Sequence, residues 1–153
     1  MNRVFVFDID DTLVIHTNQN NDLYNMNNDN ELHKLIQETP HRSIYIYTNG
    51  TYSHGEKICQ NLQLDKSVKQ IFARDNISHM KPYYESFKYV HDQIMHNNQS
   101  INEILFFDDL LDNLHTAKTY FGWTTVWISP TLNEKPQYVD YEFTNIYDAL
   151  INL

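Results

Sequence analysis

Five short apolar runs alternate with segments of helical spacing along this chain, and that alternation limits its fold more than any other feature. The runs are rich in isoleucine, valine and aromatic residues and lack polar–apolar alternation, which is typical of strands buried on both faces. They cover residues 4–7, 44–47, 71–73, 104–107 and 125–128. The pattern predicts an α/β fold: a three-layer, doubly wound parallel sheet of about five strands flanked by helices.

Apolar residues at helical spacing fill the stretches between these runs, so a helix is expected in each. The chain shows no internal repeat and no interdomain linker, and we expect residues 1–153 to form a single domain. Residues 16–30 are rich in asparagine and are expected to form a flap beside the first strand end. The expected helix faces are Leu32, Leu35 and Ile36; Ile58 and Leu62; Tyr83, Phe87, Val90 and Ile94; Leu110, Leu114, Ala117 and Phe121; and Tyr147, Leu150 and Ile151.

Hydropathy, cysteine content and net charge indicate which kinds of partner and which cellular compartment to expect. No apolar stretch has the length of a membrane-spanning helix, so no membrane partner is expected. The single cysteine, Cys59, cannot form an internal disulfide, and we expect a reducing compartment, the cytoplasm. The net charge of −9 argues against nucleic acid as the main partner, whereas a bound metal would still allow a small phosphorylated ligand.

Polar and charged residues gather where the predicted strands end. The first strand runs into Asp8 and Asp10, and the fourth ends in Asp108 and Asp109. Parallel strands bring their carboxyl ends to one edge of a sheet, where ligands bind in open α/β folds. Alone, the Asp-x-Asp pair could be a strand followed by an acidic turn, but partners at other strand ends favour a site. The further candidates at this edge are Thr48, Asn49, Gly50, Lys81 and Asn113.

Four carboxylates at one sheet edge repel one another unless they take up protons or bind a cation. All-oxygen ligands of this kind suit Mg²⁺, which keeps several waters and bridges to substrate phosphate. A carboxylate can also act as a nucleophile and form an aspartyl-phosphate. The metal and a lysine would then offset charge on the transferring phosphoryl group, so these residues predict metal-assisted phosphoryl transfer.

The same residues resemble the four motifs of the haloacid dehalogenase-like (HAD) hydrolases, in the same order. The first motif is an apolar strand followed by D-x-D-x-T, here residues 8–12. The second is an apolar strand ending in Ser or Thr, here Thr48, and the third is a lysine ahead of a helix, here Lys81. The fourth is a strand ending in paired acids, here residues 108–109, and the resemblance covers nearly the whole chain.

The resemblance implies a role for each acid. Asp8 would attack phosphorus, and Asp10 would be the general acid–base that protonates the leaving oxygen and then activates water. Dehalogenases of the superfamily lack an acid at the position of Asp10, so its presence favours a phosphatase, a phosphoric monoester hydrolase of the EC 3.1.3 class. The implied Mg²⁺ ligands are Asp8, the backbone carbonyl of Asp10, and Asp109, with Asp108 assisting directly or through water.

The resemblance also places the substrate. Thr48 and Lys81 would hold the phosphoryl oxygens, and Asn49 and Gly50 would complete the binding site. Residues 48–50, together with residues 106–113 and the later Gly122-Trp123, are similar to the pyrimidine 5′-nucleotidase-type branch, whose members carry a helical cap between the first two motifs. The short connections on both sides of Thr48 leave no room for such a cap. We therefore expect a capless member with an open site.

These inferences predict a Mg²⁺-dependent phosphatase acting on a nucleotide, a sugar phosphate or a phosphoprotein. Two alternatives stay open: a catalytically inactive phospho-ligand-binding or regulatory module on the same fold, and a polynucleotide-end phosphatase. The Asn-rich flap at residues 16–30, or a second subunit in a homo-oligomer, would partly cover the open site.

Three histidines, His16, His54 and His79, fall in loops near the predicted site edge. Contact with substrate is one interpretation, but surface or turn positions are favoured; His54 stands out because it follows the second strand at an expected helix start. Trp123 and Trp127 are expected to pack beside the last strand rather than to stack on a base.

Overall fold

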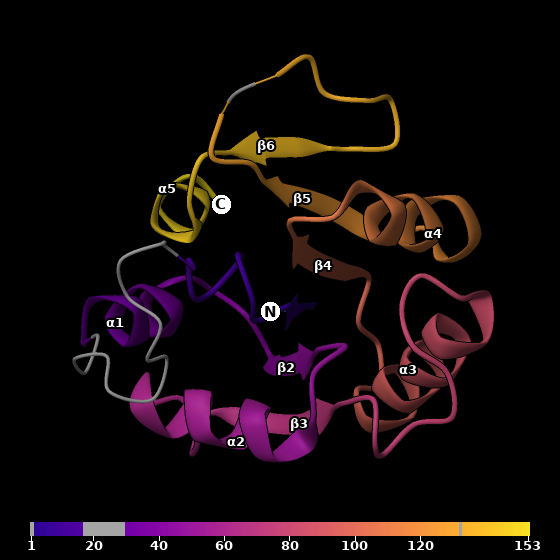
Figure 1. Ribbon diagram of the computed structural model, residues 1–153, viewed down its shortest axis with the longest axis horizontal. Helices are drawn as coiled ribbons and strands as arrows, with labels where there is room; N and C mark the ends of the chain where they lie inside the picture. Colours follow the sequence, from indigo (N-terminus) through magenta and orange to yellow (C-terminus); the bar gives the residue numbers. More distant parts are fainter. Residues whose placement is uncertain (1, 17–29, 132) are drawn as a thin grey trace.

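Six parallel strands form one open sheet in the computed structural model, which describes residues 2–16, 30–131 and 133–153. The strand order is β3-β2-β1-β4-β5-β6, and each neighbouring pair is parallel (Figure 1). All five predicted strands are present, and the α/β prediction is confirmed. The strands are β1 Arg3–Phe7, β2 Ser43–Tyr47, β3 Val68–Phe72, β4 Glu103–Asp108, β5 Thr124–Ile128 and β6 Tyr141–Phe143.

Helices cover both faces of the sheet and complete the predicted three layers. The helices α1 (Asn30–Glu38), α2 (Tyr52–Asn61) and α5 (Ile146–Asn152) pack on one face, and α3 (Tyr84–Asn97) and α4 (Leu111–Phe121) pack on the other (Figure 1). Side chains alternate along each strand, so the sheet feeds two cores. In β1, for example, residues 5 and 7 enter the first core and residues 4 and 6 enter the second.

The structure corrects the sequence prediction at three places. A sixth strand, β6, adds to the sheet edge; it has three residues and no buried side chain, so it lacks the apolar run on which strand prediction depends. Tyr83 and Leu110, expected on helix faces, are the N-cap residues of α3 and α4 and are 63% and 55% exposed. Ile151, expected on the buried face of α5, is 65% exposed.

The connections between strands are short, as a capless fold requires. Among the described residues, the β1–β2 connection contains α1 and the β2–β3 connection contains α2, and neither contains a helical bundle. Residues 17–29, which hold most of the predicted flap, lie outside the described residues. Within the described ranges, no helix has the length and apolar character needed to cross a membrane.

The order in which strands are added to the sheet changes sides at β1. From β1 it proceeds to β2 and β3 on one side, and it then returns to β4 on the other side. Ligands of open α/β sheets bind at such a switch point, outside the carboxyl ends of the strands. The carboxyl ends of β1, β2 and β4 therefore converge on one place, and most predicted site residues lie at these ends or just after them. Lys81 lies in the connection between β3 and α3.

Candidate active site

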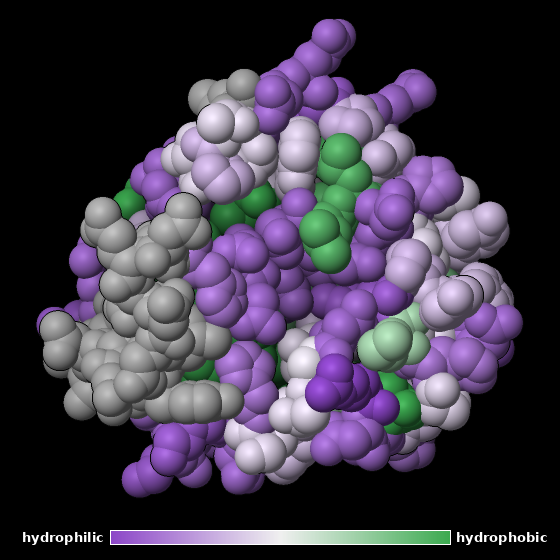
Figure 2. Space-filling view, in the orientation of Figure 1, coloured by the Kyte–Doolittle hydropathy of each residue, from purple (hydrophilic) through white to green (hydrophobic). Residues whose placement is uncertain are grey.

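A polar cavity of about 400 Å³ lies at the carboxyl ends of β1, β2 and β4. Figure 2 shows hydrophilic surface across the middle of this face of the molecule. Every residue predicted for the substrate site borders the cavity, together with three of the four predicted metal-binding acids. Its lining residues are Asp8, Asp10, Asp11, Thr48, Asn49, Gly50, Lys81, Asp109, Leu110 and Asn113.

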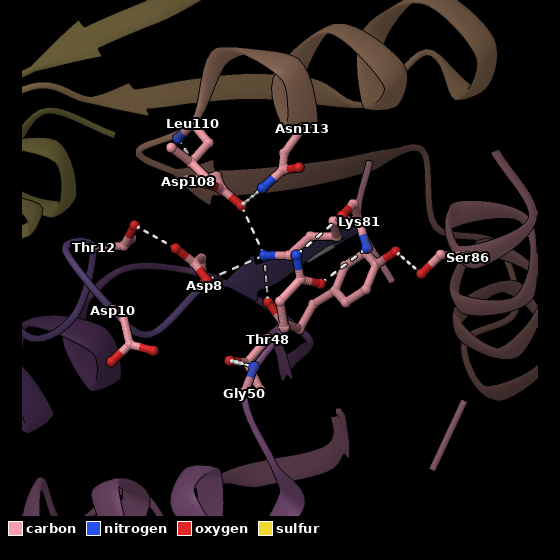
Figure 3. Close-up of polar contacts among 12 residues, drawn as sticks. Asp8, Asp10, Thr12, Thr48, Gly50, Lys81, Ser86, Asp108, Leu110 and Asn113 are labelled. Atoms are coloured by element: carbon pink, nitrogen blue, oxygen red, sulfur yellow. Dashed lines mark hydrogen bonds and ion pairs between the residues drawn. The ribbon is translucent and has the colours of Figure 1, made fainter. Parts of the chain in front are cut away.

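Asp8 is held by both of its carboxylate oxygens at the end of β1. Lys81 Nζ donates to Oδ1 at 3.1 Å, and Thr12 Oγ1 donates to Oδ2 at 3.1 Å (Figure 3). The Asp8 side chain is 11% exposed, so it reaches the cavity while most of it is shielded from water. A carboxylate fixed in this way presents a defined oxygen to a bound group.

Lys81 is enclosed at the centre of the site. Its ammonium donates to Asp8, to Asp108 Oδ2 at 2.8 Å and to the Tyr47 carbonyl oxygen at 2.8 Å. The rings of Tyr47 and Phe106 lie 5.0 and 5.5 Å from Nζ, at distances typical of cation–π contacts. Burial alone would lower the pKa of Lys81, but the Asp108 and Asp8 carboxylates outweigh it and raise that pKa above its usual value.

Asp108 is a fully buried anchor for the centre of the site. Its Oδ2 accepts from Lys81 and, at 3.1 Å, from Asn113 Nδ2, and its Oδ1 accepts from the Leu110 backbone N–H at 2.9 Å. Both oxygens therefore have hydrogen-bond donors already. This favours the indirect form of its predicted metal role, in which Asp108 holds Lys81 and assists the ion through water.

The loop after β2 holds Lys81 by its backbone. The Asn49 side-chain amide donates to the Lys81 carbonyl oxygen at 3.0 Å, and its Oδ1 accepts from the Lys81 N–H at 2.9 Å. This paired contact gives Asn49 a structural role, which is to hold the Lys81 backbone, in addition to the substrate binding predicted for it. Thr48 Oγ1 accepts from the Gly50 N–H at 3.0 Å, and Thr48 borders the cavity. Its phosphoryl-binding role stays a prediction.

Asp10 stands apart from this network, on the turn that follows β1 (Figure 3). Its side chain is 40% exposed, and its Oδ1 lies 2.9 Å from His16 Nε2 and 3.2 Å from His54 Nε2. His16 is exposed, as expected for a surface position, whereas His54 is half-buried in the first turn of α2, at the expected helix start. The sequence did not indicate the contact of either ring with Asp10. The structure gives His79 a contact with the neighbouring Ser78 hydroxyl.

Three carboxylates form a candidate cation site at this edge. Asp8, Asp108 and Asp109 each offer an oxygen, and the three oxygens lie within 4.8 Å of one another. Burial, and then the charge of Asp108, raise the pKa of Asp8 well above its usual value, and burial raises the pKa of Asp109. Because one lysine does not balance three acids, a divalent cation fits this oxygen-only donor set. The fourth predicted ligand, Asp10, lines the same cavity.

Trp127 supports the site in a way that the sequence did not indicate. Its indole Nε1 donates to the Asp109 carbonyl oxygen at 3.0 Å and so fixes the turn after β4. Thr12 and Asn113 hold Asp8 and Asp108 in a comparable manner. Sequence spacing could suggest these positions but not these partners, because each contact depends on the path of a turn.

Comparisons with solved structures identify the fold. Magnesium-bound YfnB of Bacillus subtilis, described as a HAD-hydrolase, matches at 23% identity and a TM-score of 0.64 over 80% of this chain and 53% of its own. A HAD phosphatase from Thermococcus onnurineus matches at 20% identity and 0.60, over 78% and 53%. An L-2-haloacid dehalogenase from Xanthobacter autotrophicus, with chloropropionic acid covalently bound, matches at 16% and 0.61, over 78% and 58%.

The chain therefore has the fold of the HAD superfamily, as its motifs predicted, and it spans about half the length of these structures. The neighbours include both phosphatases and dehalogenases, so the fold is common to the two chemistries. A scan of protein-family models and a search of curated proteins found no match. Similarity to the pyrimidine 5′-nucleotidase-type branch stays a prediction.

Proposed function

We propose that this protein is a Mg²⁺-dependent phosphomonoester hydrolase that works through an aspartyl-phosphate on Asp8. The observation that carries the proposal is that Asp8 and Asp10, two residues apart at the end of β1, have different surroundings. Asp8 is nearly buried and held by Lys81 and Thr12, whereas Asp10 is 40% exposed and lies apart from that network. A nucleophile and a separate proton donor are the two groups that such a hydrolysis requires.

In the proposed reaction, an oxygen of Asp8 attacks phosphorus, and the bond from phosphorus to the leaving oxygen breaks. Asp10 gives its proton to that oxygen and then takes a proton from the water that cleaves the aspartyl-phosphate. The Thr48 hydroxyl and the Lys81 ammonium would hold phosphoryl oxygens, and both border the cavity. Asp8, Asp109 and the Asp10 carbonyl would hold Mg²⁺, which supplies charge neutralisation for the phosphoryl group.

Asp10 also favours phosphatase over dehalogenase chemistry. Halide departs without a proton, whereas an alkoxide leaving group needs one, so a proton donor at this position suits a phosphomonoester. The resemblance to the superfamily makes the same distinction at this position. The substrate we propose is a small phosphorylated molecule or a phosphoprotein, because the net charge of −9 disfavours a polynucleotide.

The proposal extends to the oligomeric state and the cellular compartment. The described residues place no cap over the cavity, so a homo-oligomer in which a second subunit closes the site is part of the proposal. Cys59 is a buried free thiol, which suits a reducing compartment such as the cytoplasm.

The test is hydrolysis of aryl phosphates, nucleotides, sugar phosphates and phosphopeptides with Mg²⁺ and with a chelator. Asp8→Asn should lower turnover by about a thousandfold or more, because the nucleophile is lost. Asp92→Asn, at an exposed acid paired with Lys88 on α3, is the matched control and should keep full activity. Chloride release from 2-chloropropionate by the wild-type protein would instead indicate a dehalogenase. Mg²⁺-dependent phosphate binding without turnover across the panel would indicate a binding module.

A further inference from the structure

Two imidazoles converge on one oxygen of Asp10. His16 Nε2 lies 2.9 Å and His54 Nε2 lies 3.2 Å from Asp10 Oδ1. A carboxylate that is 40% exposed would otherwise have freedom to rotate about its side-chain bonds. Each histidine comes from a different segment of the chain, and each segment has its own means of holding the ring in place.

His54 is placed by the first turn of α2. Thr51 is the N-cap of this helix, and its hydroxyl accepts from the His54 N–H at 3.2 Å. The imidazole is 16% exposed and lies against Gly50: a Cβ atom at that glycine would be 3.3 Å from His54 Cδ2. The absence of a side chain at Gly50 thus leaves room for the His54 ring beside the Gly50 backbone, within reach of Asp10.

His16 is returned to Asp10 by the turn that follows β1. Asp11 adopts a φ of 62°, a left-handed conformation that aspartate tolerates better than most residues. Its backbone N–H donates to the Val14 carbonyl oxygen at 2.6 Å, and its Oδ1 accepts from the His16 N–H at 3.1 Å. This turn reverses the chain, so that the His16 ring faces the acid six positions earlier.

We propose that His54 and His16 are positioning residues that hold Asp10 by Oδ1 and leave Oδ2 to exchange the proton with the leaving group and with water. Oδ2 points toward the loop after β2, since it lies 4.0 Å from the Cβ position of Gly50. Both histidine contacts of Asp10 are made through Oδ1. The inference rests on the proposed phosphatase function.

The proton balance follows from this geometry. With Nε2 protonated, both rings donate to Oδ1, so the proton of the neutral Asp10 resides on Oδ2. That proton passes to the leaving oxygen as its bond to phosphorus breaks. Oδ2 then recovers a proton from the water that attacks the phosphorus of the Asp8 phosphate. The alcohol, the phosphate and the original state of Asp10 result, and neither histidine changes its protonation.

The test is the dependence of kcat/KM on the leaving group, measured on aryl and alkyl phosphates with saturating Mg²⁺. General acid catalysis matters most when the leaving group is a poor one. His54→Ala should therefore lower kcat/KM by about tenfold to a hundredfold for alkyl phosphates and only slightly for dinitrophenyl phosphate. His54→Gln, which keeps an N–H donor, should restore part of the loss. His16→Ala should act in the same direction.

His96→Gln is the matched control, because His96 is exposed in the last turn of α3 and lies outside the site cavity. An equal loss for all leaving groups, or no loss, in folded His54 and His16 variants would overturn the positioning role while leaving the proposed function intact. If the wild-type protein hydrolyses no phosphomonoester, the proposed function fails and this inference fails with it. Thermal unfolding of each variant separates loss of the fold from loss of chemistry.

Discussion

Lys81 has a hydrogen-bond acceptor for each of its three N–H bonds, and its side chain is 1% exposed. An ammonium in this state is a structural element, in addition to the phosphate-binding role proposed for it. Asp8 and Asp108 both depend on it for charge compensation. The site therefore couples the fold to the function at a single residue.

We expect Lys81→Met to destabilise the metal-free protein by about 3–5 kcal/mol, because removing one partner leaves buried carboxylates without compensation. Urea unfolding at neutral pH measures the change. Lys88→Met is the control, since the Lys88–Asp92 pair is 56% exposed at both side chains and its loss should change the unfolding free energy only slightly. A loss of that small size in Lys81→Met would show that Lys81 is not a stabilising partner.

Asp8 gives a prediction about pH. Its folded-state pKa is raised, first by burial and then by Asp108, so the metal-free protein gains stability from a neutral Asp8. That gain is complete below about pH 4, the range of an unfolded aspartate, and is lost as pH rises through the folded pKa. Asp8→Asn, which mimics the neutral form, should raise the unfolding free energy of the chelated protein at pH 7.5.

The same comparison at pH 4 provides the control, because there the Asp8→Asn and wild-type proteins should unfold at nearly equal denaturant concentrations. A difference in unfolding free energy that does not vary between pH 4 and pH 7.5 would contradict the assignment.

The acids at the sheet edge could be predicted from the sequence, because the end of a buried strand is marked by the end of an apolar run. Asp8 follows an apolar run, and parallel strands bring such ends together, so neighbours in space could be predicted from separate stretches of chain. The partners of Asp10 could not be predicted in this way. They depend on the left-handed turn at Asp11 and on the glycine under His54, and a surface position is the better prior for any single histidine.

At the level of elements, β6 shows that a strand at the edge of a sheet can lack the apolar run by which strands are predicted from sequence. The strand pairs on one side alone, through β5, and none of its three residues is buried. Central strands such as β1 are buried on both faces and read as apolar runs, whereas an edge strand needs no such run. Beyond backbone pairing and the packing of Phe143 on the core, polar contacts hold this edge: Asp140, just before β6, accepts from the Thr125 N–H at 2.8 Å and pairs with Lys118 at 2.6 Å.

Asp140→Asn should loosen this edge. Burial raises the pKa of Asp140, but Lys118 and Thr125 together lower it below its usual value. A lowered folded pKa contributes stability above about pH 4, and that stability is lost as pH falls through the folded pKa. We expect a loss of about 1 kcal/mol at pH 7, reduced by the partial exposure of the pair, and almost none at pH 2.5.

Hydrogen exchange of the β6 amides, with urea unfolding at the two pH values, checks this expectation. Glu134→Gln, at an exposed acid in the loop ahead of β6, is the control and should change neither measurement. Equal losses at both pH values would show that Asp140 acts without its charge.

At the scale of the whole molecule, the topology brings the Thr48 hydroxyl, Lys81 and the four predicted site acids to a single edge of the sheet, with Asp11 as a fifth acid beside them. A net charge of −9 adds to the negative field there. An open site of this sign would repel a free phosphate ester unless a cation is present. Metal binding, substrate binding and stability are therefore expected to depend on one another across the chain.

Mg²⁺ should stabilise the native protein, because the unfolded chain does not assemble the three carboxylates. At a free Mg²⁺ concentration ten times its Kd, the gain in unfolding free energy is about 1.4 kcal/mol. For a chain of this size that corresponds to a rise of about 3–6 °C in Tm. Asp109→Asn removes a proposed direct ligand and should abolish the rise, while Asp92→Asn, at the exposed acid of α3, should retain it. The measurement is thermal unfolding with MgCl₂ against chelator at equal ionic strength, because screening alone would raise the Tm of all three proteins alike. A rise that persists in Asp109→Asn would remove the metal site from this edge and, with it, the reason for four acids to lie there.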